Sequence, residues 1–451
     1  MVDPGPNVNG VGKEVPEGCG VENVAYVVRH GSRYPDRGAY GEWTALYSKI
    51  QAANFTANGS LSFLKAWKPA LTNPEAQIAQ ESSTGYKEAY DLGYSLRTRY
   101  PDLYEYGSPF MAWANLYPRV VQTAQNFVRG FLGSRASTLG RVITVNSTGS
   151  PLALFDSLAP SDGCPTFVDG NGGDEATKWN SIYLPPITAR LNTLIASGSL
   201  DITDADTRIM PYLCGYESQI TGTLSPWCGV FDDAELRGYE YAQDLRYYYG
   251  VGDGVDLASK MMLPFLDSLL GHVGKGRGRT GKGKDGGSFG IPEIIAAFLN
   301  DGQLTELVSA TGVLGDQKKL NGSAIPVDAE WRYRASRFVT MRGTVAFERL
   351  SCPSLSSHSS TNSTTSDHTY IRILLNDAVY PHPSCHDGPG KSCALHTYQT
   401  MTAKKLEAAG DLRTRCNISA SVLAAVGNGT SGSGASFLGD LGGSWVGSVV
   451  P

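Results

Sequence analysis

The first strong pattern along the chain is an apolar, β-branched run at residues 24–28 (VAYVV), which ends abruptly in the polar segment RHGSRYP of residues 29–35. An uninterrupted apolar run of this length is typical of a central strand that is buried on both faces, as in a parallel sheet. Ligands of such sheets bind beyond the carboxyl ends of the strands. The polar segment is therefore the first candidate for a functional site.

Apolar positions at helical spacing predict helices over about 86–100, 120–131 and 233–249, and strand patterns return at 294–299, 344–350 and 370–375. Together they predict an α/β fold with a mainly parallel central sheet flanked by helices and a mostly helical inserted domain. We expect one unit over residues 1–451. Its parts are an α/β core (approximately 18–40, 104–150 and 290–425) and mostly helical insertions (approximately 41–103 and 151–289).

Three stretches have the composition of loops or tails. Residues 273–290 are rich in glycine, lysine and arginine, which predicts a mobile basic loop. The Ser/Thr run at 354–366 predicts a glycosylated surface loop. Residues 428–451 are rich in glycine and serine, which predicts a flexible tail that frays from the domain.

Charge and hydropathy exclude several functional classes. The chain has 451 residues, with 38 Lys and Arg against 43 Asp and Glu and a net charge of −5. Bulk nucleic-acid binding needs a basic surface and is not expected. No apolar run reaches about 18 residues, so we expect no membrane-spanning helix. The sequence carries no signal of oligomeric state.

Cysteines and sequons predict an oxidising, extracellular environment. Eight cysteines are dispersed along the chain without a CxxC pair, which favours four disulfides over a zinc site and leaves their pairing open. Seven asparagines begin N-x-Ser/Thr triplets and are candidate glycan acceptors: Asn54, Asn58, Asn146, Asn321, Asn362, Asn417 and Asn428. The first residues lack the apolar stretch of a signal peptide, and we interpret the chain as a secreted, mature form whose leader has been removed.

The segment after residue 28 has the residue types that phosphoryl chemistry needs. Arg29 and Arg33 flank His30, and Gly31 allows close approach of the backbone. Guanidinium groups suit bidentate contacts with phosphate or carboxylate, and a neutral imidazole held in one tautomer can attack phosphorus. The alternative is a surface loop whose His and Arg side chains only bind their neighbours.

This segment resembles the RHGxRxP motif of the histidine acid phosphatases, in the branch that contains fungal phytases. The resemblance extends over nearly the whole chain, through TGYKEAYDLGYSLRTRYPDL (84–103), YPRVV (117–121), CGYESQITGTLSPWCGVF (214–231) and LLNDAVYPHPSC (374–385). It implies a phosphoglycerate-mutase-like sheet, a nucleophilic His30, and phosphate binding by Arg29, Arg33 and Arg119. It also implies four disulfides, Cys19–Cys352, Cys164–Cys416, Cys214–Cys228 and Cys385–Cys393.

One position departs from the family pattern. The family has a His-Asp pair after a strand, in which Asp protonates the leaving oxygen and His helps to bind phosphate; here the pair reads Asn300-Asp301. Asparagine can donate a neutral hydrogen bond but brings no positive charge. The loss should cost about 1–2 kcal/mol of transition-state stabilisation, a factor of roughly 5–30 in rate. Asp301 at a helix start is also compatible with a simple N-cap role.

The literal dipeptide His386-Asp387 has a different context. It lies in the short Cys385–Cys393 loop, with no strand running directly into it and no helix pattern after it within the loop. We therefore do not expect it to be catalytic. The remaining histidines are interpreted as surface or packing residues.

Three functional hypotheses follow. The first is a secreted acid phosphatase that hydrolyses organic phosphomonoesters, with phytate among the candidates, through a phosphohistidine; no metal or cofactor is expected, because three arginines supply the positive charge. The second is the same scaffold repurposed for another reaction on an anionic substrate, motivated by Asn300. The third is a catalytically silent binder of phosphorylated ligands. The basic loop at 275–284 is a candidate source of charge for phytate, and Tyr40 and Trp43 are candidates for an aromatic pocket rim or for core.

Overall fold

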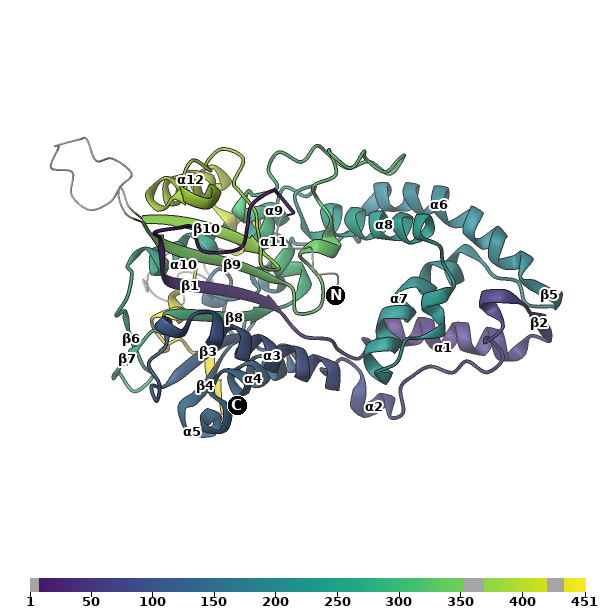
Figure 1. Cartoon of the computed structure of the whole chain (residues 1–451), viewed down its shortest axis with the longest axis horizontal. Helices are drawn as coiled ribbons and strands as arrows, with labels where there is room; N and C mark the ends of the chain where they lie inside the picture. The colour runs from purple at the N-terminus through teal and green to yellow at the C-terminus, as the bar shows by residue number, and fades with distance from the viewer. Residues whose placement is uncertain (1–7, 353–368, 420–433) are drawn as a thin grey trace.

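A single sheet forms the centre of the molecule, with helices on both faces and a largely helical region at one end (Figure 1). This computed structural model describes residues 8–352, 369–419 and 434–451. The nine-stranded sheet has the order β11-β10-β9-β1-β8-β3-β4-β13, and β12 pairs with β10. The strands are Gly20–Arg29 (β1), Phe110–Asn115 (β3), Gly140–Val145 (β4), Ile294–Leu299 (β8), Thr344–Ser351 (β9), Thr369–Leu375 (β10), Ala378–Val379 (β11), Cys393–Ala394 (β12) and Val446–Val449 (β13).

Parallel pairing is confined to the middle of the sheet. Strands β1, β8, β3 and β4 are parallel neighbours, whereas β9 and β10 on one side and β13 on the other pair antiparallel. The predicted α/β class is confirmed, and the sheet is mixed rather than mainly parallel. The apolar strand patterns could not distinguish a parallel from a mixed sheet. An apolar run shows that a strand is buried on both faces, but it does not show in which direction the neighbouring strand runs.

Strand β1 shows how the two faces of the sheet are covered. Val24, Tyr26 and Val28 point to one face, where they pack with apolar residues of helices α3 (Ser83–Arg99) and α4 (Pro118–Leu132). The alternate residues Ala25 and Val27 belong to the core on the other face. Helices α10 (Leu263–Gly274), α11 (Asp301–Thr311) and α12 (Leu395–Ala409) cover that face. Burial on both sides explains why the strand reads as one apolar run.

The largely helical region extends from the end of the sheet near the start of α3 (Figure 1). It contains helices α1 (Arg37–Ala52), α2 (Pro74–Gln77), α6 (Gly173–Thr193), α7 (Asp204–Thr221) and α8 (Asp233–Val251). Two short strands from distant segments, β2 (Phe55–Ala57) and β5 (Ile195–Gly198), pair antiparallel there. The other short elements are α5 (Ala136–Leu139), α9 (Ala258–Met261), α13 (Leu412–Arg415), β6 (Thr280–Lys282) and β7 (Ser288–Gly290).

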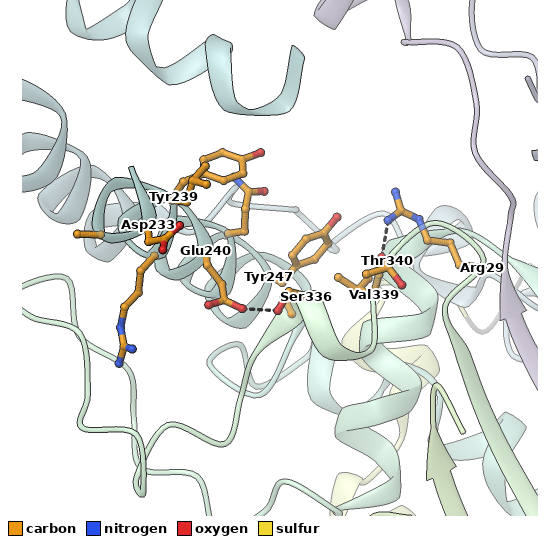
Figure 2. Close-up of a pocket in the computed structure, with 13 residues that line it drawn as sticks. Arg29, Asp233, Tyr239, Glu240, Tyr247, Ser336, Val339 and Thr340 are labelled. Carbon is orange, nitrogen blue, oxygen red and sulfur yellow. Dashed lines mark hydrogen bonds between the residues drawn. The ribbon is translucent and has the colours of Figure 1, made fainter. Parts of the chain in front are cut away.

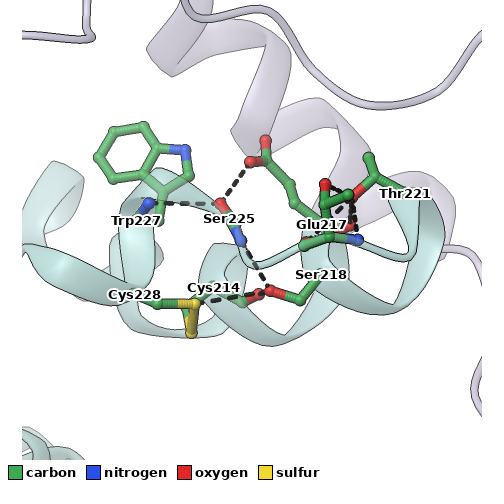
Figure 3. The surroundings of a disulfide bond; sticks show 8 residues. Cys214, Glu217, Ser218, Thr221, Ser225, Trp227 and Cys228 are labelled. Atoms are coloured by element: carbon green, nitrogen blue, oxygen red, sulfur yellow. Dashed lines mark hydrogen bonds between the residues drawn. A yellow bond between two sulfur atoms is a disulfide. The ribbon is translucent and has the colours of Figure 1, made fainter.

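The end of α7 is braced by a disulfide loop (Figure 3). Cys214 on α7 is bonded to Cys228 in the following turn, and Ser225 donates to the carboxylate of Glu217 at 2.7 Å. One helical turn further, Gln219 donates to the backbone oxygen of Arg33 at 2.8 Å. The loop thus helps to hold a helix that contacts the RHGSRYP segment. All four disulfide pairs implied by the resemblance are present and are confirmed.

The insertions are shorter than expected. Helix α3 lies within the expected insertion 41–103 but packs on the sheet with α4, and α10 lies within 151–289 but covers the opposite face. Amphipathic spacing identifies these helices but does not say whether their apolar side meets a sheet or other helices. Within the described residues, none of the helices combines the length and hydropathy that a bilayer crossing needs.

Two predicted irregular segments are structured where they are described. Val446–Val449 adds a strand to the edge of the sheet, and Phe437 and Leu438 before it are fully buried. The expected tail is therefore wrong for residues 434–451, because a few apolar anchors outweigh the surrounding glycines. The basic loop also forms the β6–β7 hairpin. The Ser/Thr run at 354–366 lies outside the described residues.

Candidate active site

The candidate site forms where three adjacent parallel strands end. Arg29 is the last residue of β1, Asn300 and Asp301 follow β8, and Arg119 lies in the first turn of α4 after β3. Because these strands are parallel neighbours in the order β1-β8-β3, their carboxyl ends meet at one edge of the sheet. The topology therefore brings together side chains that are up to 272 positions apart in the chain.

His30 is fully buried in a fixed orientation. Its Nδ1 lies 2.9 Å from the backbone oxygen of Gly31, which can only accept, so Nδ1 carries the proton and Nε2 keeps its lone pair. Nε2 is buried without a hydrogen-bond partner among the described residues. Burial first, and then the charges of Arg29, Arg119 and Arg33, lower the pKa of His30 well below its ordinary value. The ring is neutral, and its free nitrogen is the one that can act as a nucleophile.

Three guanidinium groups surround this histidine. The side chain of Arg29 donates to the backbone oxygen of Val339 and, at 3.1 Å, to Asp301. Arg119 donates to the Oδ1 atom of Asn300 at 2.8 Å. Arg33 donates to the backbone oxygen of Tyr34 at 2.9 Å. Each of the three also has a buried Nε without a partner in the described part of the chain.

Asp301 is a half-buried carboxylate at the edge of this cluster. It accepts hydrogen bonds from Arg29 and, at 2.9 Å, from the hydroxyl of Tyr247. Burial opposes its ionisation, but the charges of Arg29, Arg33 and Arg246 outweigh burial and hold its pKa well below the ordinary value. In the free site Asp301 is therefore ionised.

The departure at residue 300 has a defined place in the structure. Asn300, and not Asp301, occupies the N-cap position of α11, and its side chain makes no capping hydrogen bond. Its Oδ1 atom instead accepts from Arg119. Because the two ends of an amide point in opposite directions, the NH2 group remains available to donate to a ligand. Asp301 is the first helical residue, so the N-cap alternative for it is wrong.

The RHGSRYP segment is held by contacts with α4, with the residues just before α3 and with the first turn of α3. Gly31 N–H donates to the hydroxyl of Thr123 at 2.9 Å, and this hydroxyl donates to Glu81 at 2.7 Å. A Cβ atom on Gly85 would lie only 2.0 Å from the backbone oxygen of Ser32, so the close approach requires glycine there. These contacts fix the backbone around His30.

Some residues near the site had no signal in the sequence. Tyr247 lies on the predicted tyrosine-rich helix, but nothing in a tyrosine-rich pattern indicates which ring reaches Asp301, 54 positions away. Thr123 and Glu81 read as ordinary helix-surface and cap-region residues. Contacts between segments distant in sequence decide these roles.

Other candidates lie away from the site. His386 is tied by its Nδ1 atom to the backbone oxygen of His382 within the disulfide loop, so the literal His-Asp pair is separate. Trp43 is fully buried among Tyr212 and Tyr216 and is core rather than pocket rim.

The basic loop cannot supply charge to the site. Arg279 is 6% exposed and forms an ion pair at 3.0 Å with Glu293, directly before β8. Asp301 follows the other end of this strand, about 20 Å away at the rise of a strand. The loop therefore lies at the opposite edge of the sheet (Figure 1).

Most of the candidate glycan acceptors are accessible. Asn54, Asn58, Asn321 and Asn417 are exposed, and Asn146 is partly buried. Asn362 and Asn428 lie outside the described residues. The exposed side chains meet the steric requirement for a glycan.

Comparison with known proteins agrees with the geometry. The defining pattern of the histidine phosphatase superfamily (branch 2) matches residues 20–376. A phytase of Candida albicans is 27% identical over 409 residues, covering 89% of this chain and 82% of the phytase. A constitutive acid phosphatase of Saccharomyces cerevisiae is 25% identical over 429 residues, covering 92% and 84%. The crystal structure of the phytase from D. castellii matches with a TM-score of 0.77 at 25% identity, covering 90% and 84%. The resemblance is thereby confirmed, and the chain belongs to branch 2 of the histidine phosphatase superfamily.

Proposed function

We propose that the protein is a secreted acid phosphatase that hydrolyses organic phosphomonoesters, with phytate among the candidate substrates. The observation that carries the proposal is the free, buried Nε2 atom of His30 among three guanidinium groups. The curated relatives are acid phosphatases and phytases by name. The four disulfides and the exposed sequons support an extracellular, glycosylated protein.

The proposed reaction is a double displacement. His30 Nε2 attacks phosphorus, the P–O bond to the alcohol breaks, and a phosphohistidine forms while Asp301 passes a proton to the leaving oxygen. Water then attacks the phosphohistidine and gives its proton to Asp301, which releases inorganic phosphate and restores the free histidine. Arg29, Arg33 and Arg119 hold the phosphoryl oxygens, with Asn300 as a neutral donor beside them.

Asp301 must be protonated to act as the acid, although its pKa is low in the free site. A bound phosphoryl group brings negative charge next to Arg29 and Arg33 and offsets the positive charge that depresses this pKa. Asp301 can then take up a proton in the complex. This requirement favours an acidic working range.

Release of inorganic phosphate at about pH 3–6 tests the proposal, with phytate, an aryl phosphate and a sugar phosphate as substrates. We expect His30→Ala to lose activity by at least about 10³-fold, because the nucleophile is removed. A denaturing quench at alkaline pH should retain labelled phosphate on the wild type and not on His30→Ala. Activity that survives in His30→Ala would rule the mechanism out. An inactive wild type that gains activity in Asn300→His would indicate a different native reaction.

A further inference from the structure

A cavity of about 680 Å³ opens beside Arg29, between helix α8 and the turn Ala335–Arg337 with the residues after it (Figure 2). Arg29 contributes to its wall and donates to Asp301, so a group bound to a phosphoryl group in the arginine cluster would extend into this space. If the proposed function holds, the cavity is where the alcohol part of the substrate lies.

The wall on α8 is aromatic and acidic. Tyr239 and Tyr247 are two turns apart on one face of the helix, and Figure 2 shows both rings projecting into the pocket region, with Arg29 beyond Tyr247. Glu240 lies on the same wall and accepts a hydrogen bond from the hydroxyl of Ser336. Asp233 lines the outer part at the start of the helix.

Both arginines of the lining are already paired with carboxylates. Arg237 forms an ion pair at 2.7 Å with Asp328, which also pairs with Arg334, and Arg29 is paired with Asp301. No lysine lines this cavity, and neither Asp233 nor Glu240 forms an ion pair within the described ranges. Apart from Arg29, the wall therefore presents two carboxylates without an ion pair and one guanidinium that shares its carboxylate partner with Arg334.

From this charge balance we infer that the site selects phosphomonoesters of uncharged, ring-containing alcohols and discriminates against polyphosphorylated ones, with Asp233 and Glu240 as the specificity-determining residues. Phytate bound by one phosphate would place its remaining phosphates against these carboxylates, and like charges at short range repel. The tyrosine rings instead offer apolar faces and hydroxyl groups to a neutral ring.

The test compares myo-inositol monophosphate with phytate at pH 5–6. Both are phosphate esters of the same ring, so their leaving groups are chemically similar. The ratio of their kcat/KM values therefore reports mainly the effect of the additional phosphate charges on the substrate. We expect the wild type to prefer the monophosphate at least tenfold, and Asp233→Asn combined with Glu240→Gln to shift this ratio at least tenfold toward phytate. Glu407→Gln, on the exposed side of α12, is the matched control and should leave the ratio unchanged.

A wild type that prefers phytate, or a ratio that stays constant in the double variant, would overturn the inference. The single variant Asp233→Asn serves as a second test, because Asp233 does not share the Glu240–Ser336 hydrogen bond. If no variant hydrolyses either ester or an aryl phosphate, the proposed phosphatase function fails instead, so the two failures are distinguishable.

Discussion

Two carboxyl side chains on α11 lie less than two turns apart, and their pKa values are shifted in opposite directions. Asp301 faces the arginine cluster, and its pKa is held well below the ordinary value. Glu306 is fully buried on the same helix and lines, with Asp162, a second cavity of about 260 Å³ that also reaches Arg119, Asn300 and Asp301. Burial raises the pKa of Glu306 from 4.5 to about 8.

The difference comes from the neighbours and not from the residue type. Burial disfavours the ionised form of both carboxyl groups, but only Asp301 has a guanidinium nitrogen at 3.1 Å. Around Glu306 the nearby charges are carboxylates, Asp162 and Asp169, and the Arg246 that lines this cavity is paired with Asp169 at 2.6 Å. The same helix thus carries an ionised carboxylate, Asp301, and a carboxyl group, Glu306, that stays protonated at acidic pH.

The largest expected effect is on kcat, and it distinguishes Asp301 from Glu306. Asp301→Asn should lower kcat for an alkyl phosphate by about 10²–10⁴-fold, because the proton donor is lost. The loss should be much smaller for an aryl phosphate, whose alcohol leaves without a proton. Glu306→Gln at pH 5 should change kcat by less than about threefold, because Glu306 is already protonated there. Equal losses in both variants would contradict this assignment.

The next effect concerns stability and pH. The folded-state pKa values of Glu306 and Glu81 are both about 8, raised from 4.5 mainly by burial. Their stabilising contribution is complete below pH 4.5 and is lost as the pH rises through 8. Each contributes on the order of 3–5 kcal/mol to this decline. Thermal midpoints between pH 4.5 and 8 should therefore fall for the wild type.

Substitution tests which groups cause that decline. Glu306→Gln should flatten the curve between pH 4.5 and 8, whereas Glu407→Gln should reproduce the wild-type curve. Asp301 has the opposite sign: its depressed pKa stabilises the fold above about pH 4, and this contribution is lost only as the pH falls further. Parallel curves for the wild type and Glu306→Gln would show that Glu306 is ionised in the folded protein at pH 5.

The smallest expected effect concerns residue 300. Asn300→His should raise kcat/KM for a phosphomonoester by about two- to tenfold, because a charged donor replaces a neutral one. The gain is limited, since the Oδ1 atom that accepts from Arg119 is also lost and an imidazolium would lie beside that guanidinium. Asn300→Ala is the matched control, and we expect it to be less active than the wild type. A gain in Asn300→Ala would mean that Asn300 obstructs the substrate.

Much of the cluster could be predicted before the structure. The strand at 24–28, the loop after it and the strand before Asn300 are strong local patterns, and the resemblance added Arg119 from a distant segment. The direction of the outer strands and the folded tail were predicted incorrectly, and the place of the basic loop was left open. These features depend on which distant segment covers an edge or a face, and local spacing does not contain that information.

By itself the sequence determined the α/β class, the residues that meet at the strand ends and, through the resemblance, the disulfide pairs. Apolar periodicity and motif spacing are properties of residues that are close in sequence, so they can be recognised from the sequence alone. Only the tertiary structure decided that His30 is neutral with Nε2 free, that Asp301 is ionised and Glu306 neutral, and that the wall beside Arg29 is acidic. The protonation states and the charge of the wall are set by burial and by charges within a few ångströms, which come from segments far apart along the chain.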